Sequence, residues 1–290
     1  MANKGLGDKR EGLDDEKRDT GGESRGRTQG EALAQIEGLR LIDDVFMRAV
    51  LRDQVGLVQS ILRTVTGIGG LELARVETQR DLMRLAGARS LALDAWGVGP
   101  DGTEYDMEVQ TGVRARPRRL RYHSACMDVE ALGAGEPFER LPEQWVVFVM
   151  ERDPFGEGRP TYLFENVGPG GRRLGDGTRK LYANGSYRGD DEIGRLMADF
   201  CEPDPDRIRD PALADRVRYF KRTERGRHEM ESMSERLMRI GREDGRREGA
   251  EANLIENARS IMEAFRLTAQ QALDVLKVPE ADRPRLMELL

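Results

Sequence analysis

The chain has 290 residues and a formal net charge of −6, and 38% of its residues are hydrophobic while 34% are charged. This length and composition favour one medium-sized domain with long solvated extensions. We expect no membrane-spanning segment, because no apolar run approaches the ~18–20 residues that a bilayer crossing needs. The acidic balance does not by itself indicate a nucleic-acid-binding protein, although phosphate contacts require only one basic surface.

The beginning of the chain and its two cysteines bear on the cellular compartment. The N-terminus has no apolar stretch of the kind found in secretion signals, so we expect a cytoplasmic protein. Cys126 and Cys201 are isolated from each other and have no neighbouring His, which argues against a disulfide scaffold and a zinc site. Residues 1–37 are rich in Gly, Lys, Arg, Asp and Glu, and we expect a disordered tail there.

A helical pattern begins at Leu41, where apolar residues recur at three- and four-residue spacing. Asp43 or Asp44 can cap its start. The helical region should end at the glycine-rich segment 67–70, and the alternating residues 71–78 predict the first strand.

Residues 90–110 consist of two short alternating runs joined by Gly99-Pro100-Asp101-Gly102, which predicts an antiparallel hairpin. In the second run Asp106, Glu108 and Gln110 form the polar face. If the apolar faces of both runs join one core, Asp94 and Glu108 emerge on the same side of the sheet. Two carboxylates on adjacent strands, with Gln110 beside them, could hold a divalent cation.

Several arginines follow this hairpin and enter a helix predicted over residues 117–132: Arg114, Arg116, Arg118, Arg119 and Arg121. Arg118, Arg121 and Tyr122 share one helix face and could bind DNA phosphates. The alternative is a solvated arginine face, with Tyr122 in the core. His123 has no visible partner, and we interpret it as a surface or packing residue.

The second half of the chain continues with strands and then helices. Residues 145–150 are all apolar and predict a central strand, residues 153–156 a turn, and residues 161–165 and 180–183 edge strands. Residues 192–251 have a charged helical pattern in which Gly241, Gly245 and Gly249 favour a fraying linker over a close helix contact between two chains. Thr268 and Gln271 form a capping-box start to a short helix, and Pro279 opens another.

Asp94, followed by Glu108-Val109-Gln110, resembles the core signature of the PD-(D/E)xK nucleases, with Gln110 in the place of the usual Lys. The segments 41–53, 117–132, 146–166 and 176–187 follow in the order seen in Rpn-type recombination-promoting nucleases, also called PD-(D/E)xK family transposases. The resemblance covers roughly residues 40 to 250. It implies an α/β fold with an α-β-β-β-α-β core, in which a mixed sheet is flanked by helices. The expected divisions are a nuclease-like domain at 38–190, a charged helical extension at 191–252 and a small helical segment at 253–290.

The resemblance also implies an activity, a cofactor and a partner. The expected function is Mg²⁺-dependent cleavage of DNA, with Mg²⁺ held by the carboxylates of Asp94 and Glu108 and the main-chain carbonyl of Val109. Gln110 would orient the attacking water, although it cannot supply the positive charge of a Lys. Asp44 would be an additional acidic residue over the metal, an interpretation that competes with helix capping.

Two other classes of function stay open at this point. The chain could be a catalytically silent DNA- or protein-binding relative that keeps the nuclease fold, or an ordinary α/β domain with an acidic hairpin. DNA is the expected partner in the first interpretation, and the C-terminal helices offer a possible contact in a homo-oligomer.

Overall fold

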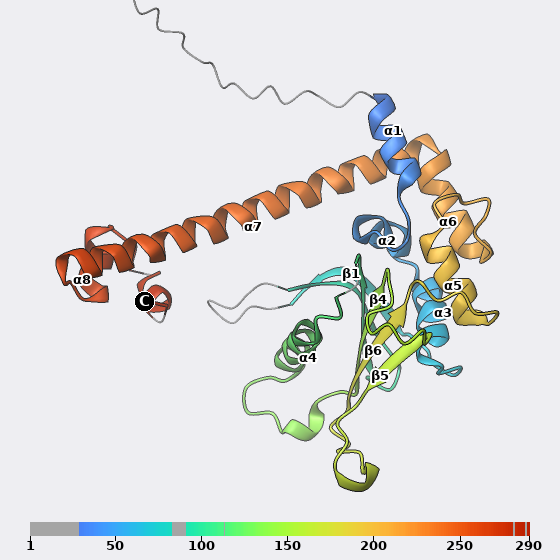
Figure 1. The fold of residues 1–290 in the computed structure, drawn as a ribbon, viewed down its shortest axis with the longest axis horizontal. Coiled ribbons are helices and arrows are strands. Elements are labelled where there is room, and N and C mark those ends of the chain that lie inside the picture. The colour runs from blue at the N-terminus through green and yellow to red at the C-terminus, as the bar shows by residue number, and fades with distance from the viewer. Residues whose placement is uncertain (1–28, 83–90, 113, 281, 288) are drawn as a thin grey trace, which may run out of the picture.

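A computed structural model describes residues 29–82, 91–112, 114–280, 282–287 and 289–290 of the chain (Figure 1). The strands are β1 (Arg75–Asp81), β2 (Ala92–Val98), β3 (Glu104–Gln110), β4 (Gln144–Met150), β5 (Thr161–Phe164) and β6 (Thr178–Asn184). The helices are α1 (Gln29–Gly38), α2 (Asp44–Leu51), α3 (Val55–Thr66), α4 (Pro117–Ala131), α5 (Glu192–Cys201), α6 (Pro211–Arg222), α7 (Glu224–Phe265), α8 (Ala269–Val275) and α9 (Arg283–Met287), with short 3₁₀ turns at Phe138–Arg140 and Pro169–Gly171.

The strands form one six-stranded mixed sheet in the order β1-β2-β3-β4-β6-β5. The predicted hairpin is confirmed, since β2 and β3 pair antiparallel, whereas β3, β4 and β6 run parallel to one another. Every residue of β4 is buried, as the apolar residues 145–150 predict, and the polar Gln144 at its start is buried with them. The prediction that β6 is an edge strand is wrong. It lies between β4 and β5, where its Leu181, Tyr182 and Ala183 are buried.

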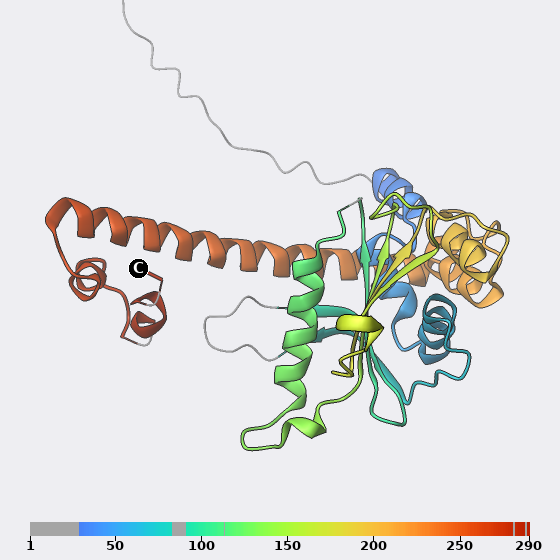
Figure 2. The same ribbon diagram turned by 60° about the horizontal axis from the view of Figure 1, so that its bottom comes forward.

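Helices cover the sheet on both faces, so the structure is an α/β sandwich with the sheet in the middle. Helices α2 and α3 pack with α5 and α6 on one face, in a core that includes Phe46, Val58, Met107 and Val147. Helix α4 lies on the other face with Trp96 and Phe148 in a second core. Figure 2 separates these layers, with the green α4 on one side of the sheet and the blue helices on the other.

The chain order of α2 and α3, three strands, α4 and then β4 agrees with the order that the sequence predicted. The single helix expected from Leu41 is nevertheless two helices. Asp53 interrupts it with a φ of 59°, in the left-handed region that an α-helix cannot continue through. The first strand begins at Arg75 rather than at Leu71, because Leu73 donates its N–H to the Gln59 side chain (2.8 Å) instead of to a neighbouring strand.

The expectation of a disordered tail up to residue 37 is wrong for its last part, and residues 1–28 lie outside the described residues. Helix α1 spans Gln29–Gly38, and its Ile36 is buried in the main core. The end of α1 is held by Lys221 of α6, whose fully buried ammonium donates to the carbonyls of Glu37 (2.8 Å), Leu39 (2.5 Å) and Pro203 (2.5 Å).

We expect Lys221→Met to lower the free energy of unfolding by about 2–4 kcal/mol, because three buried carbonyls would lose a charged donor at once. The control is Arg222→Ala on the same helix, which removes an ion pair between Arg222 and Glu37 near the surface. That change should lower the free energy of unfolding by less than about 1 kcal/mol. Urea unfolding of the two variants measures the difference, and equal losses would contradict the role assigned to Lys221.

The C-terminal part is built on α7, which continues as one helix from Glu224 to Phe265 and extends away from the sheet (Figure 1). The linker predicted around Gly241, Gly245 and Gly249 is therefore helical. At the far end α8 and α9 pack against α7 around a small core that includes Ala258 and Leu273. The predicted capping box is confirmed. Contact between two copies through these helices stays a prediction.

In the described ranges, no helix combines the length and the apolar character needed to cross a membrane.

Candidate metal site at a fork between two strands

Asp94 and Glu108 lie where β2 and β3 separate. The two strands pair only from Ala95–Met107 to Val98–Glu104. Beyond that point β2 stays paired with β1 as far as Ala92, and β3 stays paired with β4 as far as Gln110. The strands therefore form a fork, and Asp94 and Glu108 are the first residues past the last paired position.

Side chains replace the missing main-chain ladder at the fork. The Asp94 N–H donates to Glu108 Oε1 (2.9 Å), and the Val109 N–H donates to Asp94 Oδ2 (3.4 Å). Both carboxylates are almost completely buried, with exposed fractions of 3% and 1%. The structure thus brings together the two carboxylates that the sequence singled out.

The expectation that Asp94 and Glu108 share one face of the sheet needs correction. Asp94 is paired with Arg48 of α2, on one face, whereas Glu108 is paired with Arg119 of α4, on the opposite face. The physical reason is the fork itself, since strands that separate leave a gap that side chains can enter from both sides.

Burial of several carboxylates together changes their acidity. Burial raises the pKa of Asp94 to about 7, and the guanidinium of Arg48 opposes this shift. Burial, reinforced by the negative charges of Asp94 and Asp106, raises the pKa of Glu108 well above its usual value. Buried carboxylates whose pKa values are raised by one another are typical of functional sites.

Asp44 lies beside this site, on the side of α2. Its half-exposed carboxylate pairs with Arg48 (2.5 Å), and its charge contributes to the raised pKa of Asp94. Capping of α2 by an aspartate side chain is not observed. Asp43 occupies the N-cap position, but its carboxylate accepts the N–H of Arg40 (2.8 Å) instead of a helical N–H.

Gln110 extends the site along β3, and the sequence interpretation missed the arginine that binds it. Arg119 donates through Nη1 to Gln110 Oε1 (2.6 Å) and through Nη2 to Glu108 Oε2 (2.8 Å). Arg118 and Arg121, which the sequence interpretation preferred, are exposed on the same helix, and Tyr122 is half-buried. The sequence does place Arg119 and His123 four residues apart, which puts them on one helix face. This spacing is the signal that could have identified the two residues as neighbours.

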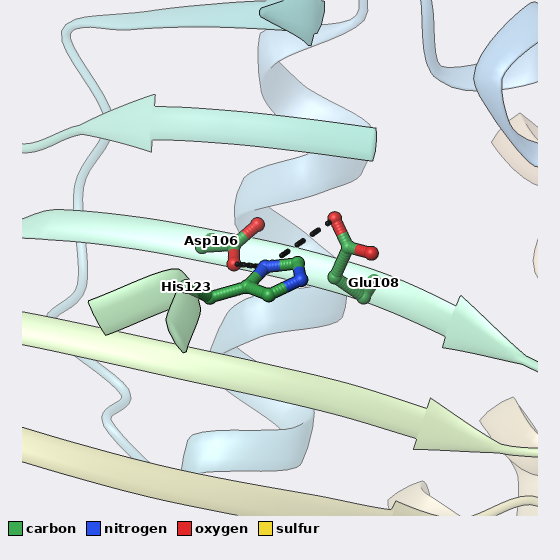
Figure 3. Close-up of side chains that lie close together, drawn as sticks. All are labelled: Asp106, Glu108 and His123. Carbon is green, nitrogen blue, oxygen red and sulfur yellow. Dashed lines mark hydrogen bonds and ion pairs between the residues drawn. The ribbon is translucent and has the colours of Figure 1, made fainter. Parts of the chain in front are cut away.

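His123 is completely buried and is neither a surface residue nor a packing residue alone. Its Nδ1 lies 2.7 Å from Asp106 Oδ2 and 3.9 Å from Glu108 Oε1 (Figure 3). Asp106, Glu108 and His123 each offer a ligand atom within 4.8 Å of the others, so this group could hold a metal ion. The buried Asp106 Oδ1 has no hydrogen-bond partner among the described residues.

The charges and the unsatisfied oxygen atom around the fork favour a bound cation. Three buried carboxylates (Asp94, Asp106 and Glu108) face two arginines, Arg48 and Arg119, so ionising all three leaves an excess of negative charge. An unsatisfied carboxylate oxygen is costly when buried, and a cation would satisfy it. Carboxylate oxygens suit Mg²⁺, whereas the imidazole of His123 suits transition metals better.

Comparison of this chain with protein-family models, with curated proteins and with solved structures found no match. The assignment of a function to this protein therefore depends on the residues of the fork and on their geometry.

Proposed function

We propose that this protein is a Mg²⁺-dependent DNA endonuclease of the PD-(D/E)xK type, similar to the Rpn-type recombination-promoting nucleases. The observation that carries the proposal is the fork, where Asp94 and Glu108 lie buried side by side at the end of the β2–β3 ladder. The order of helices and strands supports it, because it agrees with the α-β-β-β-α-β order that the sequence resemblance implies.

The Mg²⁺ ligands in this proposal are the carboxylates of Asp94 and Glu108 and the carbonyl of Val109. Val109 donates its N–H to Asp94, so the main chain at Val109 faces the fork. N–H and C=O groups of one strand residue point toward the same neighbouring strand, which places the carbonyl on that side too. Bound Mg²⁺ supplies Lewis acidity, which polarises a phosphoryl oxygen and lowers the pKa of a coordinated water.

The reaction is hydrolysis of a phosphodiester. The water oxygen forms a bond to phosphorus, the bond from phosphorus to the leaving sugar oxygen breaks, and a proton ends on that oxygen. Gln110, on the same strand as Glu108, orients the water by hydrogen bonding. Buried walls around the fork keep bulk water away from the two carboxylates, which strengthens their electrostatic interactions.

DNA contacts in this proposal come from the exposed residues of α4 next to the fork. Arg118 and Arg121 are exposed on the helix that also carries Arg119, so their guanidinium groups are accessible to a DNA phosphate backbone. Tyr122 lies on the same helix and completes the expected DNA-binding set.

Arg118→Ala and Arg121→Ala should each weaken DNA binding to the same degree for unrelated sequences. Each lost phosphate contact should also reduce the slope of log affinity against log salt by about 0.9. Fluorescence anisotropy with labelled duplexes at several salt concentrations, in Ca²⁺, measures both quantities. A slope equal to that of the unaltered protein would assign these arginines to a solvated face.

The experiment that tests the proposed function is cleavage of supercoiled plasmid by the purified chain in Mg²⁺ and in EDTA. We expect nicked and linear products in Mg²⁺ alone. A second candidate, a catalytically silent DNA-binding relative, is favoured by one observation, which is that Arg48 and Arg119 already neutralise both carboxylates. Binding of DNA without cleavage in either Mg²⁺ or Mn²⁺ would select that candidate.

A further inference from the structure

Arg119 is bonded on three sides by residues of the candidate site. Its Nη1 donates to Gln110, its Nη2 donates to Glu108, and its Nε lies 3.3 Å from His123 Nε2. The side chain is 36% exposed, so part of Arg119 is open to the solvent although its guanidinium is bonded to the fork. Among the described residues that contact Glu108, it is therefore the cation placed to meet an incoming ligand.

The hydrogen bonds of Arg119 determine which nitrogen of His123 carries the proton and how Asp106 holds the imidazole ring. Arg119 Nε–H can only donate, so His123 Nε2 accepts and the imidazole proton is on Nδ1. That Nδ1–H then donates to Asp106 Oδ2 (2.7 Å). The His123 ring also makes a T-shaped contact with the ring of Phe148, with ring centroids 5.3 Å apart. A buried chain from Asp106 through His123 thus holds the guanidinium of Arg119 in one orientation.

We infer that Arg119 supplies the positive charge that Gln110 cannot, by binding a non-bridging oxygen of the scissile phosphate, and that His123 and Asp106 position it. This inference rests on the proposed function. The usual Lys of the motif would stand at position 110, and the Arg119 guanidinium lies only 2.6 Å from the Gln110 side chain. A planar guanidinium binds phosphate oxygens through two parallel hydrogen bonds, which suits it to this role.

Arg119 has two successive partners in this account. In the metal-free protein it neutralises Glu108. When Glu108 serves as a metal ligand, its charge is shared with the cation, and the guanidinium of Arg119 turns to the phosphate. Arg119 therefore competes with a cation for Glu108 before DNA binds and assists cleavage afterwards.

These two roles predict effects of opposite sign for Arg119→Ala. Mg²⁺ affinity measured by calorimetry without DNA should increase severalfold, because Glu108 loses a competing partner. The cleavage rate at saturating DNA should fall about 10²-fold, the usual effect of losing one preorganised donor to transition-state charge. The control for the calorimetry is Arg118→Ala, an exposed arginine one position away, which should leave Mg²⁺ affinity unchanged.

Rescue gives a second test. Gln110→Lys places an ammonium at the usual motif position on β3. Added to Arg119→Ala, it should raise the cleavage rate at least tenfold above that of Arg119→Ala alone. His123→Gln should lower the rate at saturating DNA while the KM for DNA stays constant, because a loosened Arg119 is present but misplaced.

Three results separate the possible failures. Absence of Mg²⁺ binding and cleavage in the unaltered protein would overturn the proposed function and this inference with it. Normal cleavage by Arg119→Ala in an otherwise active protein would overturn the inference alone. A lower Mg²⁺ affinity together with a lower melting temperature in Arg119→Ala would assign Arg119 a purely structural role and would also overturn it.

Discussion

Asp94→Ala should abolish Mg²⁺-dependent cleavage of plasmid DNA, with a loss on the order of 10³-fold or more. The change removes one of the two carboxylates that hold the cation, and with it the charge stabilisation and water activation that the cation supplies. Glu108→Ala should have an equal effect for the same reason. DNA affinity measured in EDTA should not fall, because neither carboxylate attracts a phosphate.

The matched control is Asp101→Ala, which removes a carboxylate from the turn of the same hairpin. Asp101 is exposed, and its carboxylate accepts hydrogen bonds from the N–H and the hydroxyl of Thr103 in that turn. We expect this variant to cleave DNA at the normal rate. Asp94→Asn serves as a second test of the site, since an amide of the same shape preserves packing around Arg48. Full Mg²⁺-dependent activity of the Asp94 variants, in preparations free of other nucleases, would refute the mechanism.

Mg²⁺ affinity should rise steeply between pH 6 and pH 8. The pKa of Asp94 is raised to about 7 by burial, so below pH 7 a cation must displace a proton from this carboxylate. Each displaced proton makes the affinity change by up to about tenfold per pH unit, and the raised pKa of Glu108 adds to the effect. Calorimetric titrations in two buffers of different ionisation enthalpy measure the number of protons released.

The same pKa shift affects the stability of the metal-free protein. A carboxylate whose folded pKa exceeds its unfolded value stabilises the fold fully below the unfolded pKa, and this contribution is lost as the pH rises through the folded pKa. For Asp94 the loss extends from about pH 4 to pH 7. Mg²⁺ should therefore raise the melting temperature more at pH 8 than at pH 6. A Mg²⁺ affinity that is the same at pH 6 and at pH 8 would contradict the assignment of Asp94 as a ligand.

The sequence alone predicts the parts of this structure that depend on local pattern. The β2–β3 hairpin follows from the turn residues between two alternating runs, and the buried strand β4 follows from its continuous apolar sequence. The capping box at Thr268 is equally local. These features need only neighbouring residues, so tertiary contacts did not override them.

The parts that the sequence did not predict depend on residues distant in the chain. Arg48 and Arg119 reach the fork from helices on opposite faces of the sheet, and a list of charged residues cannot distinguish Arg119 from Arg118. His123 lacked a visible partner because Asp106 lies 17 residues earlier, on a different element. The alternating sequence pattern does not reveal where β2 and β3 separate. Both strands continue past this point, because β2 stays paired with β1 and β3 stays paired with β4.

The most direct test of the central claim is a crystal structure of the protein soaked in Mn²⁺, with data collected for anomalous scattering. Mn²⁺ substitutes for Mg²⁺ at oxygen ligands and gives a signal that locates it without ambiguity. We expect one anomalous peak at the fork, within coordination distance of Asp94, Glu108 and the Val109 carbonyl. A peak bound by Asp106 and His123 without Asp94, or no peak near Glu108, would contradict the proposed metal site.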